Sequence, residues 1–137
     1  MKTLLPPGWP RPKGYAAGVA AEGRFVFVSG QVGWDAGGHF VSEDLAAQVE
    51  RALQNVVAVL AEAGGEPRHI ARLTWYVTDK RAYLANQNAI GAAYRAVLGR
   101  HFPAMSVVEV SALVEDAALV EIEATAVIPL APEPHAS

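Results

Sequence analysis

Residues 24–29 read Arg-Phe-Val-Phe-Val-Ser, and this stretch predicts a β-strand that is apolar on both sides. Successive side chains of a strand point to opposite faces of its sheet. Phe25 and Phe27 therefore share one face. Val26 and Val28 share the other. Apolar residues on both sides imply that both faces of this sheet are covered.

Two amphipathic helices and further strands are expected around this strand. Ser42 is a suitable helix N-cap, and apolar residues follow at helical spacing from Leu45 to Leu60. Asp79 can cap a second helix that ends at Gly99. Strands are expected at residues 14–21, 24–29, 72–78, 105–110 and 118–128. Because two helices can cover only one face of a sheet, the other face must meet water or another subunit.

The last two strands indicate what lies against that other face. Alternation leads us to expect one set of side chains under the helices, namely Val108, Val110, Val120 and Ile122. It places a second set on the uncovered face, namely Met105, Val107, Glu109, Glu121 and Glu123. Apolar side chains mixed with carboxylates favour a partner subunit there, because monomers rarely expose large apolar patches.

The composition is typical of one soluble domain spanning residues 1–137, with a core at about residues 15–128 between proline-rich ends. The formal net charge is −3 and there is no basic run, which argues against nucleic acid as a partner. The sequence has no cysteine, and its four histidines show no ligand spacing, so no metal site is expected. No signal peptide and no apolar run of about 20 residues is present, so we expect a cytoplasmic protein without a membrane partner.

Three segments resemble motifs of a single family. Residues 25–31, Phe-Val-Phe-Val-Ser-Gly-Gln, are similar to the FVSGQ strand of the YjgF/RidA family, also called the endoribonuclease L-PSP family. Residues 102–110, Phe-Pro-Ala-Met-Ser-Val-Val-Glu-Val, resemble its RPARSCVEV signature. Residues 120–124, Val-Glu-Ile-Glu-Ala, resemble its VEIEA strand. The resemblance covers about residues 15–128, and the order of the three motifs makes it specific.

The resemblance implies an α+β fold of the chorismate mutase-like type, a mixed sheet with two helices on one face. It also implies a homotrimer with a central barrel and small-molecule clefts between subunits. Active members hydrolyse enamine and imine intermediates to keto acids and ammonia, without a metal or organic cofactor. In those members the arginine of the PARS motif holds the substrate carboxylate in a bidentate pair. Here Met105 stands at the arginine position and Val107 at the cysteine position.

Four further positions match the family and are candidate site residues, namely Tyr15, Ser29, Gly30 and Glu121. Glu121 is the candidate catalytic residue, which would orient or activate a water at an imine carbon. The alternative is a strand carboxylate paired with an arginine of the next subunit. Ser29, next to Gly30, either binds a ligand oxygen or satisfies its own turn. Tyr15 either forms a wall of the cleft or is an ordinary half-buried tyrosine.

Apolar positions complete the candidate site. Met105 and Val107 are expected to border the substrate, with Met105 filling the space of the missing guanidinium. The alternative for Met105 is a residue of a subunit-interface core. Trp34 and Trp75 are more often packing residues than ligand platforms.

Three functions follow from this resemblance. The first is an enzyme that hydrolyses a C=N bond or a related small electrophile but differs from standard 2-imino acid deaminases. The second is a non-catalytic trimer that binds a metabolite in the same clefts. The third is a ribonuclease, against which the acidic balance counts. With Met105 in place of arginine, we expect the cleft to prefer an uncharged or cationic small molecule with an apolar part.

Overall fold

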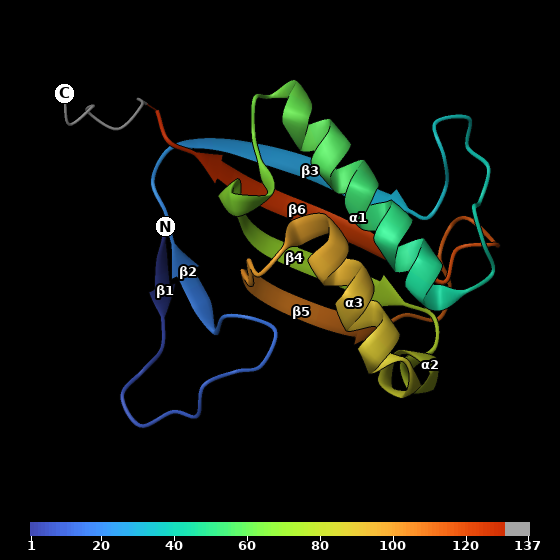
Figure 1. The fold of residues 1–137 in the computed structure, drawn as a ribbon, viewed down its shortest axis with the longest axis horizontal. Coiled ribbons are helices and arrows are strands. Elements are labelled where there is room, and N and C mark those ends of the chain that lie inside the picture. Colours follow the sequence, from blue (N-terminus) through green and yellow to red (C-terminus); the bar gives the residue numbers. More distant parts are fainter. Residues whose placement is uncertain (131–137) are drawn as a thin grey trace.

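The computed structural model describes residues 1–130, which form a mixed β-sheet with helices packed on one face (Figure 1). In chain order the elements are β1 (Lys2–Leu4), β2 (Gly18–Ala20), β3 (Arg24–Val32), α1 (Leu45–Glu62), a 3-10 turn (Pro67–His69), β4 (Ile70–Val77), α2 (Lys80–Ala85), α3 (Gln87–Leu98), β5 (Ala104–Glu109) and β6 (Val120–Ile128). The loose segment expected at the C-terminus lies, from residue 131 on, outside the described residues.

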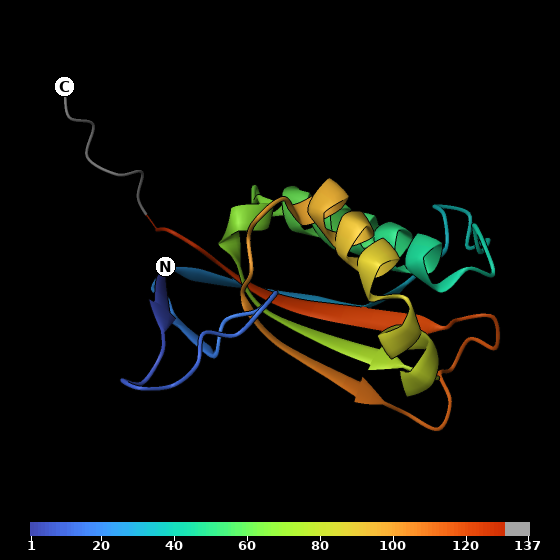
Figure 2. The same ribbon diagram turned by 60° about the horizontal axis from the view of Figure 1, so that its bottom comes forward.

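The main sheet has the strand order β3-β6-β4-β5. β6 is antiparallel to both β3 and β4, whereas β5 runs parallel to β4. The long helices α1 and α3 lie side by side on one face, and Figure 2 shows them on a single side of the sheet. Their apolar stripes and the buried side chains of β4 and β6 form one core. The predicted α+β fold with two long helices on one face of a mixed sheet is therefore confirmed.

The first predicted strand lies outside this main sheet. Only Gly18–Ala20 of residues 14–21 is a strand, and it pairs with Lys2–Leu4, which the sequence patterns did not indicate. The preceding segment is nevertheless attached to the edge of the main sheet. Ala16 forms a parallel bridge with Ala104, and its N–H donates to the carbonyl oxygen of Pro103 at 3.0 Å.

Both helices begin or break at places where a side chain satisfies backbone groups. The N-cap of α1 is Asp44 rather than Ser42, because the Asp44 carboxylate accepts from the N–H of Ala47 at 3.0 Å. The Ser42 hydroxyl accepts instead from the N–H of Asp44. The second helix is divided at Asn86, whose side-chain amide donates to the carbonyl oxygen of Ala82 at 2.7 Å. Such local side-chain bonds compete with regular helix geometry.

The orientation of β5 is opposite to the expected one. Parallel pairing places Met105 beside Leu73 and Val107 beside Trp75, so Met105 and Val107 pack against the helix-covered core. Val108 is 43% exposed on the other face. The prediction that Val108 and Val110 lie under the helices was wrong, because alternation defines two faces of a strand without saying which one meets the core. For β6 the prediction was correct: Val120 and Ile122 are buried under the helices.

The face of the sheet without helices carries exposed aromatic side chains. Phe25 is 56% and Phe27 is 74% exposed, and their rings contact each other edge to face at a centroid distance of 6.1 Å. Polar groups lie beside them, including the Tyr76 hydroxyl, which donates to the Glu123 carboxylate at 2.7 Å. This hydrogen bond raises the pKa of Tyr76 above its ordinary value. Among the described residues, no helix has the length and apolar character required to cross a bilayer.

Candidate functional site

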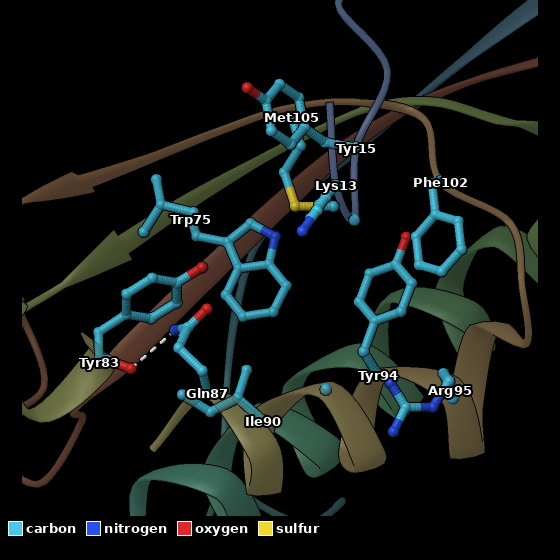
Figure 3. A pocket seen from close by; sticks show the side chains of 13 residues that line it. Lys13, Tyr15, Trp75, Tyr83, Gln87, Ile90, Tyr94, Arg95, Phe102 and Met105 are labelled. Atoms are coloured by element: carbon cyan, nitrogen blue, oxygen red, sulfur yellow. Dashed lines mark hydrogen bonds between the residues drawn. The ribbon is translucent and has the colours of Figure 1, made fainter. Parts of the chain in front are cut away.

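A cavity of about 620 Å³ opens at the β5 edge of the sheet, between α3 and the segment that precedes β2 (Figure 3). Met105 and Val107 of β5 form part of its wall. Tyr15 borders it from the N-terminal segment, held there by the hydrogen bond and bridge of the adjacent Ala16. Three of the residues predicted for the site are thus brought together.

Aromatic rings form a continuous wall of this cavity. The Trp75 ring packs against Tyr83 and, nearly parallel, against Tyr94, with a centroid distance of 6.3 Å in both pairs. Tyr94 in turn stacks on Phe102 at 5.5 Å. The Tyr94 hydroxyl donates to the carbonyl oxygen of His101 at 2.6 Å, and burial raises the pKa of Tyr94 well above its ordinary value. Tyr94 is therefore a neutral structural element of the wall.

Trp75 has an unsatisfied hydrogen-bond donor. Its side chain is only 2% exposed, and its indole Nε1 is the one buried side-chain nitrogen or oxygen in residues 1–130 that has no hydrogen-bond partner. Figure 3 shows this nitrogen pointing toward the space between Lys13, Tyr94 and Phe102. Leaving a buried donor unpaired costs about 1–3 kcal/mol, so a ligand that accepts from this N–H recovers that energy.

Two cationic side chains border the cavity, and no aspartate or glutamate is among its lining residues. Lys13 comes from the N-terminal segment, where Gly14 adopts a positive φ of 79° that favours glycine. Arg95 comes from α3 and lies back over Gly91, where an added Cβ would approach the Arg95 guanidinium to 3.1 Å. Neither cation forms an ion pair within the described part of the chain.

The remaining predicted site residues lie elsewhere. Glu121 is on the face of β6 opposite to the buried Val120 and Ile122, and thus on the side of the sheet without helices. Gly30 lies directly against it, because an added Cβ there would come within 2.6 Å of the Glu121 carboxyl carbon. Ser29, also in this region, accepts a bond from the Gln31 amide at 3.4 Å.

Ser29 also borders a second hollow of about 450 Å³ on this uncovered face, together with Arg72 and Glu123. The structure therefore brings the six predicted residues together as two separate groups rather than one. The prediction that Met105 and Val107 share a face with Glu121 was wrong, for the reason given for β5.

Sequence reasoning missed several residues of the cavity and left Trp75 open between packing and site. Lys13 and Phe102 had no signal, since only the fold brings their segments to β5. The helix residues that line the cavity did have a sequence signal, because they recur at intervals of four and so share one helix face. They are Tyr83, Gln87, Gly91 and Arg95. Trp34, the other tryptophan considered, packs against Phe40 away from this cavity. In the described part of the chain, no three histidine, aspartate or glutamate side chains are grouped as metal ligands.

Fold and cavity together define an α+β protein with a ligand-sized hollow at a sheet edge and an uncovered sheet face. Residues 10–128 match the family model described as Endoribonuclease L-PSP. The chain is 37% identical over 116 residues to the 2-iminobutanoate/2-iminopropanoate deaminase of Salmonella typhimurium, covering 82% of this chain and 86% of the relative.

Solved structures agree with the sequence relatives. A Rid-family protein of unknown function from Yersinia pestis superposes with a TM-score of 0.82 at 35% identity, covering 93% of this chain and 98% of the other. The YjgF gene product of Escherichia coli gives a TM-score of 0.65 at 34% identity, with coverage of 93% and 98%. The chain therefore belongs to the YjgF/RidA family.

Proposed function

We propose that this protein forms trimers whose inter-subunit clefts bind a small reactive metabolite and hydrolyse its C=N bond. Membership of the family supports this, as does the activity named for the Salmonella relative, deamination of 2-iminobutanoate and 2-iminopropanoate. A ligand-sized cavity bordered by Tyr15, Met105 and Val107 also supports the proposal.

One observation carries the proposal: the predicted site residues lie on opposite sides of the same sheet. Tyr15, Met105 and Val107 border the cavity on the helix side, and the sheet separates them from Glu121 and Ser29. A single chain thus holds two half-sites. A second chain that covers the exposed face around Phe27 brings its own Met105 half toward the first chain's Glu121 half, and a head-to-tail ring of three repeats this contact three times.

The chemistry of such a cleft requires only water and proton transfers. The Glu121 carboxylate accepts a proton from water as the oxygen adds to the imine carbon. The carboxyl group passes this proton to the nitrogen, which gives an amino alcohol. Glu121 then carries the hydroxyl proton to the same nitrogen, so that the C–N bond breaks and ammonia leaves as the C=O bond forms. The reaction consumes one water for each C=N bond and involves no oxidant or reductant.

Met105 sets the expected substrate range apart from that of arginine-bearing relatives. A charge-assisted bond to a carboxylate contributes roughly 1.5–3 kcal/mol, which corresponds to about one to two decades of affinity. We therefore expect little turnover of the small imines derived from serine or threonine.

Complementation between subunits tests the proposal. Tyr15→Ala removes one half-site at a side chain that is 46% exposed, and Glu121→Gln removes the other. Imines are generated in situ by an amino-acid oxidase, and their loss is followed by trapping. Each variant alone is expected to be inactive. In a co-refolded 1:1 mixture about three-quarters of the trimers are mixed and each of these has one intact cleft of three, so the mixture recovers about a quarter of the wild-type rate. Two inactive variants that stay inactive when mixed would contradict the shared site.

A binding protein without turnover is the second candidate, favoured by Met105 at the position where a substrate-holding arginine is expected. In that case Glu121→Gln alters the affinity for a ligand, and none of the imines generated by the amino-acid oxidase is consumed faster with the protein than in buffer alone. A ligand at 100 times its dissociation constant stabilises the fold by about 2.7 kcal/mol, so thermal shift detects it without turnover.

A further inference from the structure

We propose that the cavity beside β5 selects a carboxylate that carries an aromatic ring, held by the Trp75 N–H together with Lys13 and Arg95. This inference rests on the proposed cleft and names its ligand class. It assigns the role of carboxylate recognition to three side chains outside the motifs that identified the family.

The first step concerns the indole of Trp75. A side chain in a residue that is 98% buried normally has its donor paired, yet this buried donor has no partner and faces Lys13 and the Tyr94–Phe102 stack (Figure 3). Indole is a donor only, so its partner must be an acceptor atom of a ligand or a water.

The second step concerns charge. Lys13 and Arg95 are the charged side chains of the lining, and both are cations without an ion-pair partner in residues 1–130. Even when a neighbouring subunit adds Glu121, the cations outnumber the carboxylate. An anionic acceptor group complements both the Trp75 N–H and the positive charge of the lining, which reverses the expectation of an uncharged or cationic ligand.

The third step concerns the rest of the ligand. The Tyr94–Phe102 ring pair and the Met105 and Val107 side chains offer aromatic and apolar contacts along one part of the wall. Aromatic rings pair favourably with one another, and a thioether adapts to a ring edge. A volume of about 620 Å³ holds a six-membered ring with a short acid side chain. An aliphatic acid of three or four carbons leaves this wall largely uncovered.

Nitrogen-15 NMR of the tryptophan indoles tests the inference directly. The chain has three tryptophans, so its spectrum holds three indole N–H peaks, which Trp→Phe variants assign. The probes are phenylacetate, the neutral phenylacetamide, the cationic phenethylamine and the aliphatic butanoate. We expect phenylacetate to move the Trp75 peak downfield, as a new hydrogen bond requires, while the Trp34 peak stays in place. The other three probes are expected to bind at least about tenfold more weakly.

Matched variants separate recognition from folding. Trp75→Phe keeps the ring and removes the donor, and is expected to weaken phenylacetate binding about 10- to 100-fold. Trp34→Phe, on a ring that packs against Phe40, leaves the affinity unchanged. Arg95→Gln weakens binding and its salt dependence, whereas Arg100→Gln, at a residue outside this cavity, does neither.

The inference is overturned if phenylacetamide or phenethylamine binds as tightly as phenylacetate, or if Trp75→Phe leaves the affinity unchanged. Equal binding of butanoate overturns the aromatic part. These readouts need no turnover: selective phenylacetate binding without hydrolysis of any imine refutes the proposed enzyme and leaves the ligand class standing. If small aliphatic imines are turned over but phenylacetate does not bind, the proposed ligand class is refuted and the proposed enzyme stands.

Discussion

Replacing both exposed phenylalanines of β3 by serine, Phe25→Ser with Phe27→Ser, is expected to dissociate the trimer. The two side chains are 56% and 74% exposed in the single chain. An aromatic side chain buries about 150–250 Å² when fully covered, so the exposed parts amount to about 260 Å². At about 25 cal/mol per Å², covering them contributes up to about 6 kcal/mol per subunit, or about four decades in the dissociation constant. This is an upper bound, because ordering and desolvation oppose association.

Sedimentation velocity over a range of micromolar concentrations measures this effect. We expect wild type to sediment as a trimer and the double variant as a folded monomer, with unchanged far-ultraviolet circular dichroism. Val59→Ser and Val114→Ser are the matched controls, since these valines are 42% and 96% exposed but lie on α1 and in a loop. A wild-type monomer, or a double variant that stays trimeric, would refute the argument that the uncovered face is an interface.

Three further predictions concern single positions. Met105→Arg is expected to raise turnover of the imines derived from serine and threonine by about one to two decades, and an unchanged rate in the trapping assay would place the carboxylate contact elsewhere. Gly30→Ala forces the Glu121 carboxyl group to move about 1 Å, which is expected to lower turnover about 100-fold with little change in melting temperature; equal turnover would exclude Glu121 from the reaction. Burial, aided by the nearby Arg68 charge, lowers the pKa of His69. The stability it contributes is therefore complete above its unfolded pKa of about 6.5 and declines as the pH falls below that value. Urea midpoints at about pH 7.5 and about pH 5 should differ less in His69→Gln than in wild type, and an equal difference would assign the acid sensitivity to other groups.

Local patterns were sufficient for most of the fold. The alternation of residues 25–28 placed Phe25 and Phe27 on one face and Val26 and Val28 on the other, and the structure confirms this division, with the two valines toward the core and the two phenylalanines exposed. The apolar spacing from Leu45 to Leu60 likewise defined the buried face of α1. Such patterns depend on residues that are close in the sequence. They do not predict a feature that is determined by pairing between strands far apart in the sequence. The choice of face for β5 depends on its parallel register with β4, which no local pattern contains.

The candidate site was predictable only where a motif fixed it. Met105, Val107 and Tyr15 were found from the resemblance, and they meet at one cavity. Lys13 and Arg95 were not, because Lys13 lies in an irregular segment and Arg95 lies outside the apolar stripe of its helix. The charge of a cleft depends on which charged side chains the fold directs toward it. The composition gives only the net charge of the whole chain.

The position of the cation changes what a cleft of this family selects. An arginine at position 105 would extend from the strand itself, beside Val107 and Trp75, and its guanidinium would take up space next to the aromatic wall. With Met105 there, the wall stays apolar, and Arg95 of α3 and Lys13 supply positive charge from the rim. Gly91 makes this possible on the helix side, since a larger residue would meet the Arg95 guanidinium where it now lies. An anion held by these cations and the Trp75 N–H leaves the wall beside Met105 free for a ring, so loss of the motif arginine is consistent with a larger, aromatic acid rather than with loss of anion binding altogether.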